Sequence, residues 1–280
     1  MKLFKFETYK TFSRWRTYIG FGVIALVVLL TEVVMRLSAG EIIHRMMRSF
    51  QKDFLIVGNI LNAWFVTGFI MNSLHIHIPF LITLVAGDIV SNEATSGTVR
   101  FLLTRPPSRQ RILNAKYMTA LFYTAGLVIF FGLLSTFLGL ALFGSGDLII
   151  HHYGKFDIIF IPEAEVPLRM LLAFAGAVWS MTVVASLAFL LSALAENSIG
   201  PIIGTMAVVI VFLIFGNLPL DFFRNLKPYF FTTYMTLWQG FFDIPIRWQE
   251  IGRSALILGL HNIGLFLAAS IVYRRKDIRS

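Results

Sequence analysis

Cysteine is absent from the chain, so neither a disulfide nor a thiolate metal site can form. This absence leaves the redox compartment undecided. Charged residues are scarce as well: they make up 14% of the 280 residues, while hydrophobic residues make up 57% and the mean hydropathy is +0.76. Soluble domains carry about 25% charged residues, so the composition disfavours a water-soluble fold.

A phosphate-binding loop is also missing. The chain contains no G-x-x-x-x-G-K-[ST] sequence and no polar stretch long enough for a nucleotide-binding domain. It likewise lacks a motif of paired carboxylates or clustered metal ligands. We therefore expect no catalytic residue, no metal site and no cofactor in this chain.

Long apolar runs are what the sequence does contain. Six runs are long enough to cross roughly 30 Å of hydrocarbon as helices. The expected spans are residues 17–36, 54–87, 112–143, 167–194, 199–219 and 254–273. The predicted fold class is therefore all-α, with residues 1–280 forming one polytopic membrane domain. Pro79 is expected to kink the second span. Because polar and aromatic residues precede the first run and no clear cleavage site follows it, we expect this span to be retained.

Basic residues concentrate on one side of these spans. Fourteen of the 24 Lys and Arg residues lie in the N-terminal segment, the link after the second span and the C-terminal tail. They are Lys2, Lys5, Lys10, Arg14, Arg16, Arg100, Arg105, Arg109, Arg111, Lys116, Arg274, Arg275, Lys276 and Arg279. This side carries the whole net charge of +9. The positive-inside rule then predicts a cell-membrane protein with both termini in the cytoplasm, and the basic pI does not indicate nucleic acid binding.

Residues 1–16 predict an interfacial helix. On a helix, Phe4, Thr8, Thr11, Phe12 and Trp15 share one face, and basic residues cover the rest. This pattern is typical of a helix lying on an anionic membrane leaflet, which makes membrane lipids a partner. The alternative is a basic flank that only orients the first span.

The link of residues 87–116 is about thirty residues long, although a few residues suffice to join two helices. A helix from Asp88 toward Thr95 is expected, followed by a break at Gly97 and a stop at Pro106. Apolar residues beside charges on this surface suggest docking onto a protein partner.

The order of residues in this link resembles the ABC-2 type permease family of ABC transporters. The resemblance is carried by Glu93, Ser96, Gly97, Thr98, Leu102, Leu103, Arg105, Pro106, Ser108, Arg109 and Lys116. The architecture is similar too, with a basic N-terminal helix, six spans and a short link after the fourth span near Glu196.

The resemblance implies the membrane subunit of an exporter in which residues 88–104 are a coupling helix, seated in a groove of a cytoplasmic ATPase. Two ATPase copies would bind ATP and magnesium, and a second permease chain, identical or different, would complete the pathway. The residues implied to contact the ATPase are Asp88, Glu93, Ser96, Gly97, Thr98, Arg100, Leu102, Leu103, Arg105, Pro106, Arg109 and Glu196. Arg105 and Arg109 are open between the ATPase and lipid phosphates. Nothing in the sequence indicates the substrate.

Few polar residues lie within the spans. Glu32 is the sole acid there, and Arg36 at i+4 is its expected ion-pair partner, with a substrate site as the alternative. Because buried acids are so scarce, a proton- or sodium-coupled carrier is disfavoured.

Four residues of the second run are candidates for the translocation path: Asn62, Asn72, His75 and His77. The two histidines lie about 200° apart around a helix, so they cannot chelate one metal, and a structural role is the alternative. The other functional hypothesis is a membrane-embedded enzyme or assembly factor that handles a metal or haem through His75, His77, His151, His152 or His261.

Overall fold

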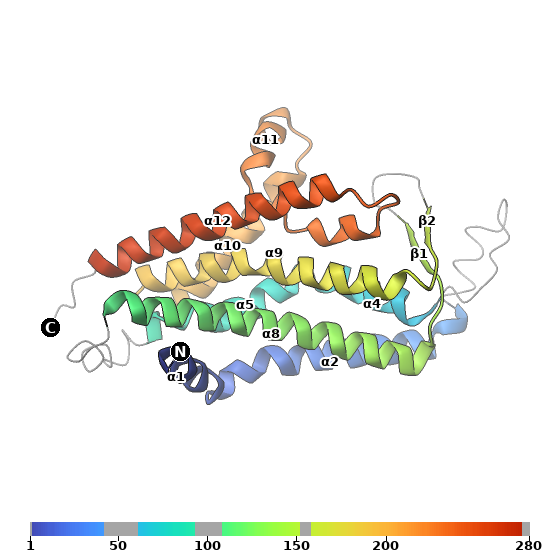
Figure 1. The fold of residues 1–280 in the computed structure, drawn as a ribbon, viewed down its shortest axis with the longest axis horizontal. Helices are drawn as coiled ribbons and strands as arrows, with labels where there is room; N and C mark the ends of the chain where they lie inside the picture. Colours follow the sequence, from blue (N-terminus) through green and yellow to red (C-terminus); the bar gives the residue numbers. More distant parts are fainter. Residues whose placement is uncertain (1, 42–60, 93–107, 152–157, 276–280) are drawn as a thin grey trace.

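The computed structural model describes residues 2–41, 61–92, 108–151 and 158–275, and these form an elongated helical bundle (Figure 1). Its helices are α1 (Lys2–Phe12), α2 (Trp15–Leu37), α4 (Ala63–Leu74), α5 (His77–Ala86), α8 (Arg109–Phe143), α9 (Val166–Leu194), α10 (Ile199–Asn217), α11 (Asp221–Leu226) and α12 (Trp248–Arg275). Five of them are long and apolar enough to cross a membrane, and α4 with α5 makes a sixth if the bent pair is one span. The predicted fold class, a helical polytopic membrane protein, is confirmed.

Helix α9 lies at the centre of the bundle, in contact with α5, α8, α10 and α12. In its most apolar stretch 72% of the residues are buried, against 28% in α2 and 17% in α12. Small side chains allow this close packing: Ser180, Ala185, Ser186 and Ala188 are all fully buried. The outer helices therefore present most of their apolar surface away from the bundle, where lipid would lie.

The second span is broken. Helices α4 and α5 meet at a bend of 59°, with His75 and Ile76 at the break. The sequence predicts a kink at Pro79, and the break falls one turn earlier. A proline ring clashes with the carbonyl of the residue four positions before it, which here is His75, so the helix is interrupted there.

Two short strands, β1 (Leu148–His151) and β2 (Ile158–Ile161), pair antiparallel between α8 and α9, with Leu148 opposite Ile161. This hairpin was not predicted from the sequence. Asn62 ties it to the second span, because its side-chain amide donates to the Asp147 carbonyl at 2.6 Å while its oxygen caps α4.

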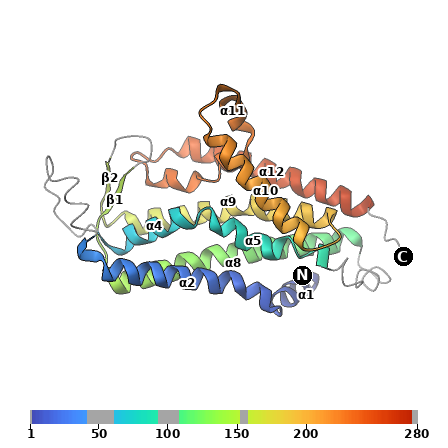
Figure 2. The same ribbon diagram turned by 180° about the vertical axis from the view of Figure 1, so that it is seen from behind.

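After α10 the chain leaves the bundle and returns. Helix α11 projects sideways (Figures 1 and 2), and three 3₁₀ turns follow: η1 (Lys227–Tyr229), η2 (Phe231–Thr233) and η3 (Leu237–Phe242). The last turn packs against α9, with Leu237, Trp238 and Phe241 buried. The aromatic residues of this segment thus cover the central helix.

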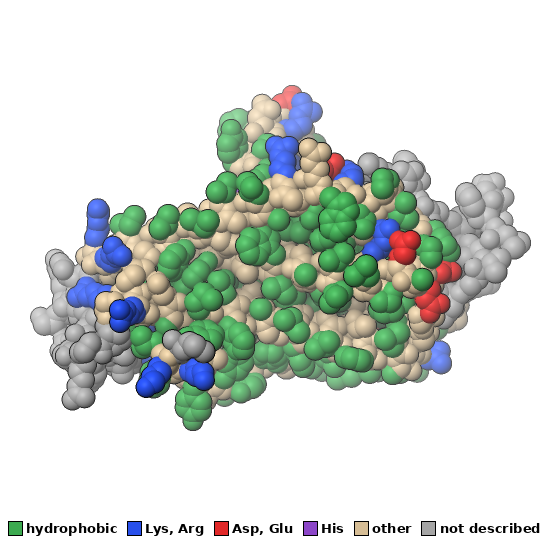
Figure 3. Space-filling model, in the orientation of Figure 1, with side chains coloured by type: hydrophobic (Ala, Val, Ile, Leu, Met, Phe, Trp, Pro, Cys, Tyr) green, Lys and Arg blue, Asp and Glu red, His purple; other side chains and the backbone are tan. Residues whose placement is uncertain are grey.

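The two ends of the bundle differ in charge. Lys and Arg side chains gather where α1 lies and α12 ends, and acidic side chains gather at the end with the strands (Figure 3). We refer to them as the α1 end and the ribbon end.

Candidate functional site at the α1 end of the bundle

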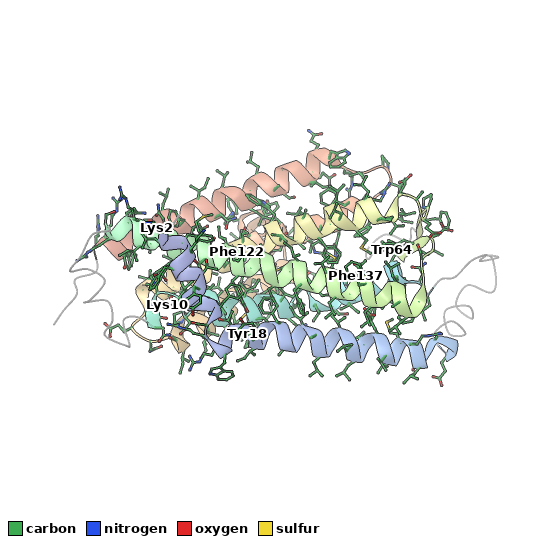
Figure 4. The ribbon with its side chains drawn as sticks, turned by 60° about the horizontal axis from the view of Figure 1, so that its bottom comes forward. Lys2, Lys10, Tyr18, Trp64, Phe122 and Phe137 are labelled. Carbon is green, nitrogen blue, oxygen red and sulfur yellow. The ribbon has the colours of Figure 1, made fainter. Side chains whose placement is uncertain are left out.

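Helix α1 lies across α8 (Figure 4). Phe4 and Phe12 both make edge contacts with the ring of Phe122, at centroid distances of 5.9 and 6.2 Å. The face of Phe4, Thr11 and Phe12, predicted to meet lipid, therefore packs on protein instead. Exposed aromatic side chains lie on the other face of α1, where Phe6 and Tyr9 are 55% and 76% exposed, and Trp15, the first residue of α2, is 73% exposed. That face suits the membrane interface.

A buried ion pair fixes α1 on α8. Lys116 Nζ donates to Glu7 Oε2 at 2.9 Å and to the Ile89 carbonyl at 3.4 Å. The Lys116 and Glu7 side chains are 1% and 2% exposed. One ammonium group thus joins three segments: α1, the chain just after α5, and α8. A charge pair removed from water this completely needs close partners, because each unpaired ion would cost several kcal/mol.

A second ion pair reaches the same region. Arg14, between α1 and α2, donates to Asp88 Oδ2 at 3.1 Å, and the Asn92 amide donates to the same oxygen. Asp88 itself is buried. We call residues 87–92 the anchored turn. The ion pair with Arg14 ties this turn to the segment between α1 and α2.

Helix α9 holds the anchored turn from its other side. Ser192 Oγ accepts hydrogen bonds from the Val90 and Ser91 amides, at 3.1 and 3.0 Å. A Cβ added at Gly87 would lie 2.7 Å from the Thr83 carbonyl oxygen and 3.3 Å from Pro201 in the first turn of α10, so this approach requires glycine. The link between α9 and α10 therefore packs beside the anchored turn.

Three of the residues predicted to contact the ATPase lie among the described residues, and nine do not. Asp88 lies in the anchored turn, Arg109 opens α8 with an exposed side chain, and Glu196 is exposed in the short link after α9. The others lie outside the described residues: Glu93, Ser96, Gly97, Thr98, Arg100, Leu102, Leu103, Arg105 and Pro106. Their placement and the expected helix beyond Asn92 remain predictions.

Sequence reasoning missed Glu7, Arg14 and Ser192 as members of this cluster. Glu7 and Lys116 each carried a signal, because one is a lone acid in a basic helix and the other is a lysine at the start of an apolar run. Charges in such places require partners. Ser192 carried none, since serine in an apolar helix commonly bonds its own backbone.

The candidate path residues divide into two groups. Asn62 is buried and structural, as the cap of α4. Asn72 and His77 are exposed beside the α4–α5 break, and Gln239 donates to Asn72 Oδ1 at 3.3 Å. His75 at the break packs its ring against Trp238, with centroids 6.1 Å apart. We call Asn72, His77 and Gln239, three polar residues at or beside the break, the break patch.

A cavity of about 190 Å³ adjoins the break patch through Gln239. Asp243, Arg247 and Glu250 contribute its charged lining. Arg247 donates to Asp243 Oδ2 at 2.7 Å, and this hydrogen bond and the attraction to that carboxylate raise the pKa of the guanidinium. The guanidinium therefore stays charged at any physiological pH.

The predicted pair of Glu32 and Arg36 is wrong. Glu32 is fully buried and its carboxyl contacts Ser135 Oγ at 3.3 Å, whereas Arg36 is exposed. Val28, Glu32 and Met35 lie on the buried face of α2, and Arg36, which is about 40° further around the helix than Glu32, lies beyond the edge of that face. His261, at a histidine position of the alternative hypothesis, bonds the Ile257 carbonyl of its own helix, and the side chains of His151 and His152 lie outside the description.

Comparison with known proteins decides the family. Residues 26–279 match the family described as "Protein of unknown function (DUF2705)". The chain belongs to this family. This match does not assign the chain to the ABC-2 type permeases, so the resemblance of residues 87–116 to that family supports only a proposal.

Two curated relatives come from Bacillus subtilis (strain 168). The protein described as "Uncharacterized protein YhcI" is 28% identical over 205 residues, which cover 70% of this chain and 63% of the relative. The "Uncharacterized membrane protein YdbK" is 30% identical over 143 residues, or 51% of this chain and 50% of the relative. The chain thus spans between half and two thirds of the length of these relatives. With the helices above, the comparisons support a multi-pass membrane protein.

Proposed function

We propose that this chain is the membrane-spanning subunit of an ATP-driven exporter whose ATPase is a separate polypeptide. Two copies of the ATPase bind ATP and magnesium at the α1 end, and a second permease chain completes the pathway. The basic charge at that end places it in the cytoplasm under this proposal. The chain itself performs no catalysis.

The anchored turn carries the proposal. A segment that transmits force from an ATPase has to be joined rigidly to the spans at both of its ends. Residues 93–107, which contain the ABC-2-like motif, begin at the anchored turn and end at α8. Arg14 and Lys116 donate hydrogen bonds to the turn, and Ser192 Oγ accepts hydrogen bonds from it. Lys116 belongs to α8 itself.

These bonds define which helices would move when the ATPase moves residues 93–107. A push on residues 93–107 would move the anchored turn together with α8, and through Glu7 and Arg14 it would move α1 and the start of α2. The short link after α9 lies against the same turn, so the central helix would follow. Packed interfaces move as rigid bodies because they do not deform continuously.

The break patch supplies a candidate path. Polar side chains facing hydrocarbon would lose hydrogen bonds to water, so Asn72, His77 and Gln239 suit a surface that is covered by the second permease or lines water. This patch would be the place where substrate passes between the two permease chains.

The decisive experiment purifies the chain together with its ATPase partner, reconstitutes the complex in proteoliposomes and measures ATP hydrolysis. Glu93→Arg or Leu103→Arg should abolish the dependence of hydrolysis on this chain while leaving the chain inserted. Glu163→Arg, the same kind of change at an exposed position of the ribbon end, is the matched control and should leave hydrolysis unchanged. Unchanged hydrolysis in the Glu93 and Leu103 variants, or substrate movement at full rate without the ATPase, contradicts the proposal.

No observation favours the metal or haem enzyme. Within residues 2–41, 61–92, 108–151 and 158–275, no three His, Cys, Asp or Glu side chains are grouped to hold a metal ion.

A further inference from the structure

Glu32 is enclosed by three helices, and nothing in the proposed function uses it. Glu32 lies on α2 and contacts Ser135 on α8, and Ser135 in turn contacts Thr67 on α4. All three residues are fully buried. Glu32 Oε1 lies 3.3 Å from Ser135 Oγ, which lies 3.4 Å from Thr67 Oγ1. Thr67 Oγ1 in turn lies 3.4 Å from the Ser135 carbonyl oxygen.

Counting hydrogens decides the state of the carboxyl. Each hydroxyl has one hydrogen to donate. If Glu32 is ionised, Ser135 must donate to it, Thr67 must then choose between the two Ser135 oxygens, and one of the three contacts lacks a hydrogen. If Glu32 is protonated, it donates to Ser135 Oγ, Ser135 donates to Thr67, and Thr67 donates to the carbonyl. The protonated acid alone supplies a hydrogen to every contact.

The described residues around Glu32 provide no counter-charge. The α4 sequence and the part of α8 from Tyr117 to Phe143 contain no Asp, Glu, Lys, Arg or His. On α5 the titratable residue is His77, which is exposed and bonds the Ser73 carbonyl, and on α2 the nearest cation is the exposed Arg36. The second carboxyl oxygen, Oε2, is buried and has no hydrogen-bond partner among the described residues. An ionised carboxyl in this position would be a buried charge without compensation.

We propose that Glu32, Ser135 and Thr67 form a proton-binding site between α2, α8 and α4. Glu32 holds a proton while the three helices are closed as they are here. If water reaches the contact between α2 and α8, Glu32 gives that proton to water, and it takes one back when the contact is dry again. The site thus couples hydration of this contact to proton exchange.

This inference runs against the expectation that buried acids are too scarce in this chain for a proton-coupled carrier. A single acid suffices because the Ser135 and Thr67 hydroxyl groups continue a chain of hydrogen bonds from its proton to the Ser135 carbonyl. The inference does not depend on an ATPase partner, so its test uses the full-length chain alone.

Infrared spectroscopy of the purified full-length chain tests the protonation state. At neutral pH, the difference spectrum between the wild type and Glu32→Gln should show the C=O stretching band of a protonated carboxylic acid, which the variant loses. Glu7 and Asp88 are present in both samples and cancel. In Ser135→Ala the band should remain and shift to higher frequency, because the acid has lost the oxygen to which it donated.

Labelling of the unaltered chain gives a second readout that needs no variant. Dicyclohexylcarbodiimide, which partitions into apolar regions, reacts with protonated carboxyls: the acid adds across one C=N bond and its proton passes to nitrogen. Peptide mass mapping should find this adduct at Glu32 at neutral pH, and less of it as the pH rises.

Two results would overturn the inference. One is a carboxylate band for Glu32 at neutral pH with no adduct. The other is an acid band that appears only after sodium and potassium are removed, because the group would then be a metal-cation ligand. An acid band that is present at neutral pH with either salt supports the proton site.

Discussion

Lys116 and Glu7 lie 109 positions apart in the chain, yet their side-chain charges meet at 2.9 Å, almost completely shielded from water. This contact joins an N-terminal helix that could otherwise float on the membrane surface to the longest helix of the bundle. Since the Ile89 carbonyl shares the same ammonium group, the pair also supports the anchored turn. Its loss should therefore affect stability and coupling together.

Breaking this pair should destabilise the chain strongly. Lys116→Met leaves Glu7 buried without its cation, and such a change typically costs about 3–5 kcal/mol. The measurement is the free energy of unfolding, or the melting temperature, of the purified chain in detergent. Glu7→Leu should show a similar loss, because it leaves the ammonium unpaired.

The double variant Glu7→Leu with Lys116→Met separates pairing from packing. Removal of both charges at once should restore most of the lost stability, since a well-packed apolar pair often equals a buried ion pair. Lys5→Met, at an exposed position of α1, is the control and should stay within about 0.5 kcal/mol of wild type. Losses in the two single variants that simply add in the double variant would show that the charges do not interact.

The pair of Arg14 and Asp88 should matter more for coupling than for folding. Arg14 is 35% exposed, so the pair contributes about 0–1 kcal/mol to stability and Asp88→Asn should fold. If the proposed function holds, the looser anchored turn should lower chain-dependent ATP hydrolysis in the reconstituted complex by about fivefold or more.

A charge swap is the test of that assignment. The double variant Arg14→Asp with Asp88→Arg should recover part of the hydrolysis lost in either single variant. If Asp88→Asn couples as well as wild type, the anchored turn does not transmit force through this pair.

The sequence predicted the span arrangement because so few charges interrupt the apolar runs. It failed where packing between distant segments decides. Helix α1 has aromatic residues on two faces, Phe4 with Phe12 and Phe6 with Tyr9, and hydrophobic pattern alone could not show which of them meets α8. The expected Glu32–Arg36 pair was wrong for a similar reason. A rule about i+4 neighbours within one helix does not include Ser135, which α8 brings into contact with Glu32.

The part of the candidate site that is local in sequence was predictable, and the part built from distant segments was not. A motif can be recognised from residues 87–116 because its members are neighbours in sequence. The groups that hold the anchored turn come from α1, α8 and α9, and their convergence follows from the fold. Only unusual placement, such as Lys116 beside an apolar run, gave a local hint of it.

Gly132 should control how closely α8 approaches α9. A Cβ at this position would lie 3.0 Å from the ring of Phe174, so Gly132→Ala must push the helices apart or displace the ring. Overpacking of this kind costs about 1–3 kcal/mol, seen as a lower melting temperature of the purified chain.

Gly126 offers the matched control on the same helix. A Cβ there meets nothing within 4 Å, so Gly126→Ala should be neutral or stabilising by up to about 1 kcal/mol through helix propensity. Equal effects at both positions would mean that the contact with Phe174 does not limit helix packing.

The absence of cysteine makes the orientation directly measurable. A cysteine placed at Ser108, exposed at the start of α8, should react with a membrane-impermeant maleimide only after the cells are opened. A cysteine placed at Glu163, exposed at the ribbon end, should react in intact cells. The physical reason is the excess of Lys and Arg at the α1 end, which favours retention of that end in the cytoplasm. Each variant carries a single thiol, so the unmodified chain is a blank for both reactions. Labelling of Ser108→Cys in intact cells, with protection of Glu163→Cys, would invert the topology and remove the α1 end from reach of any cytoplasmic ATPase.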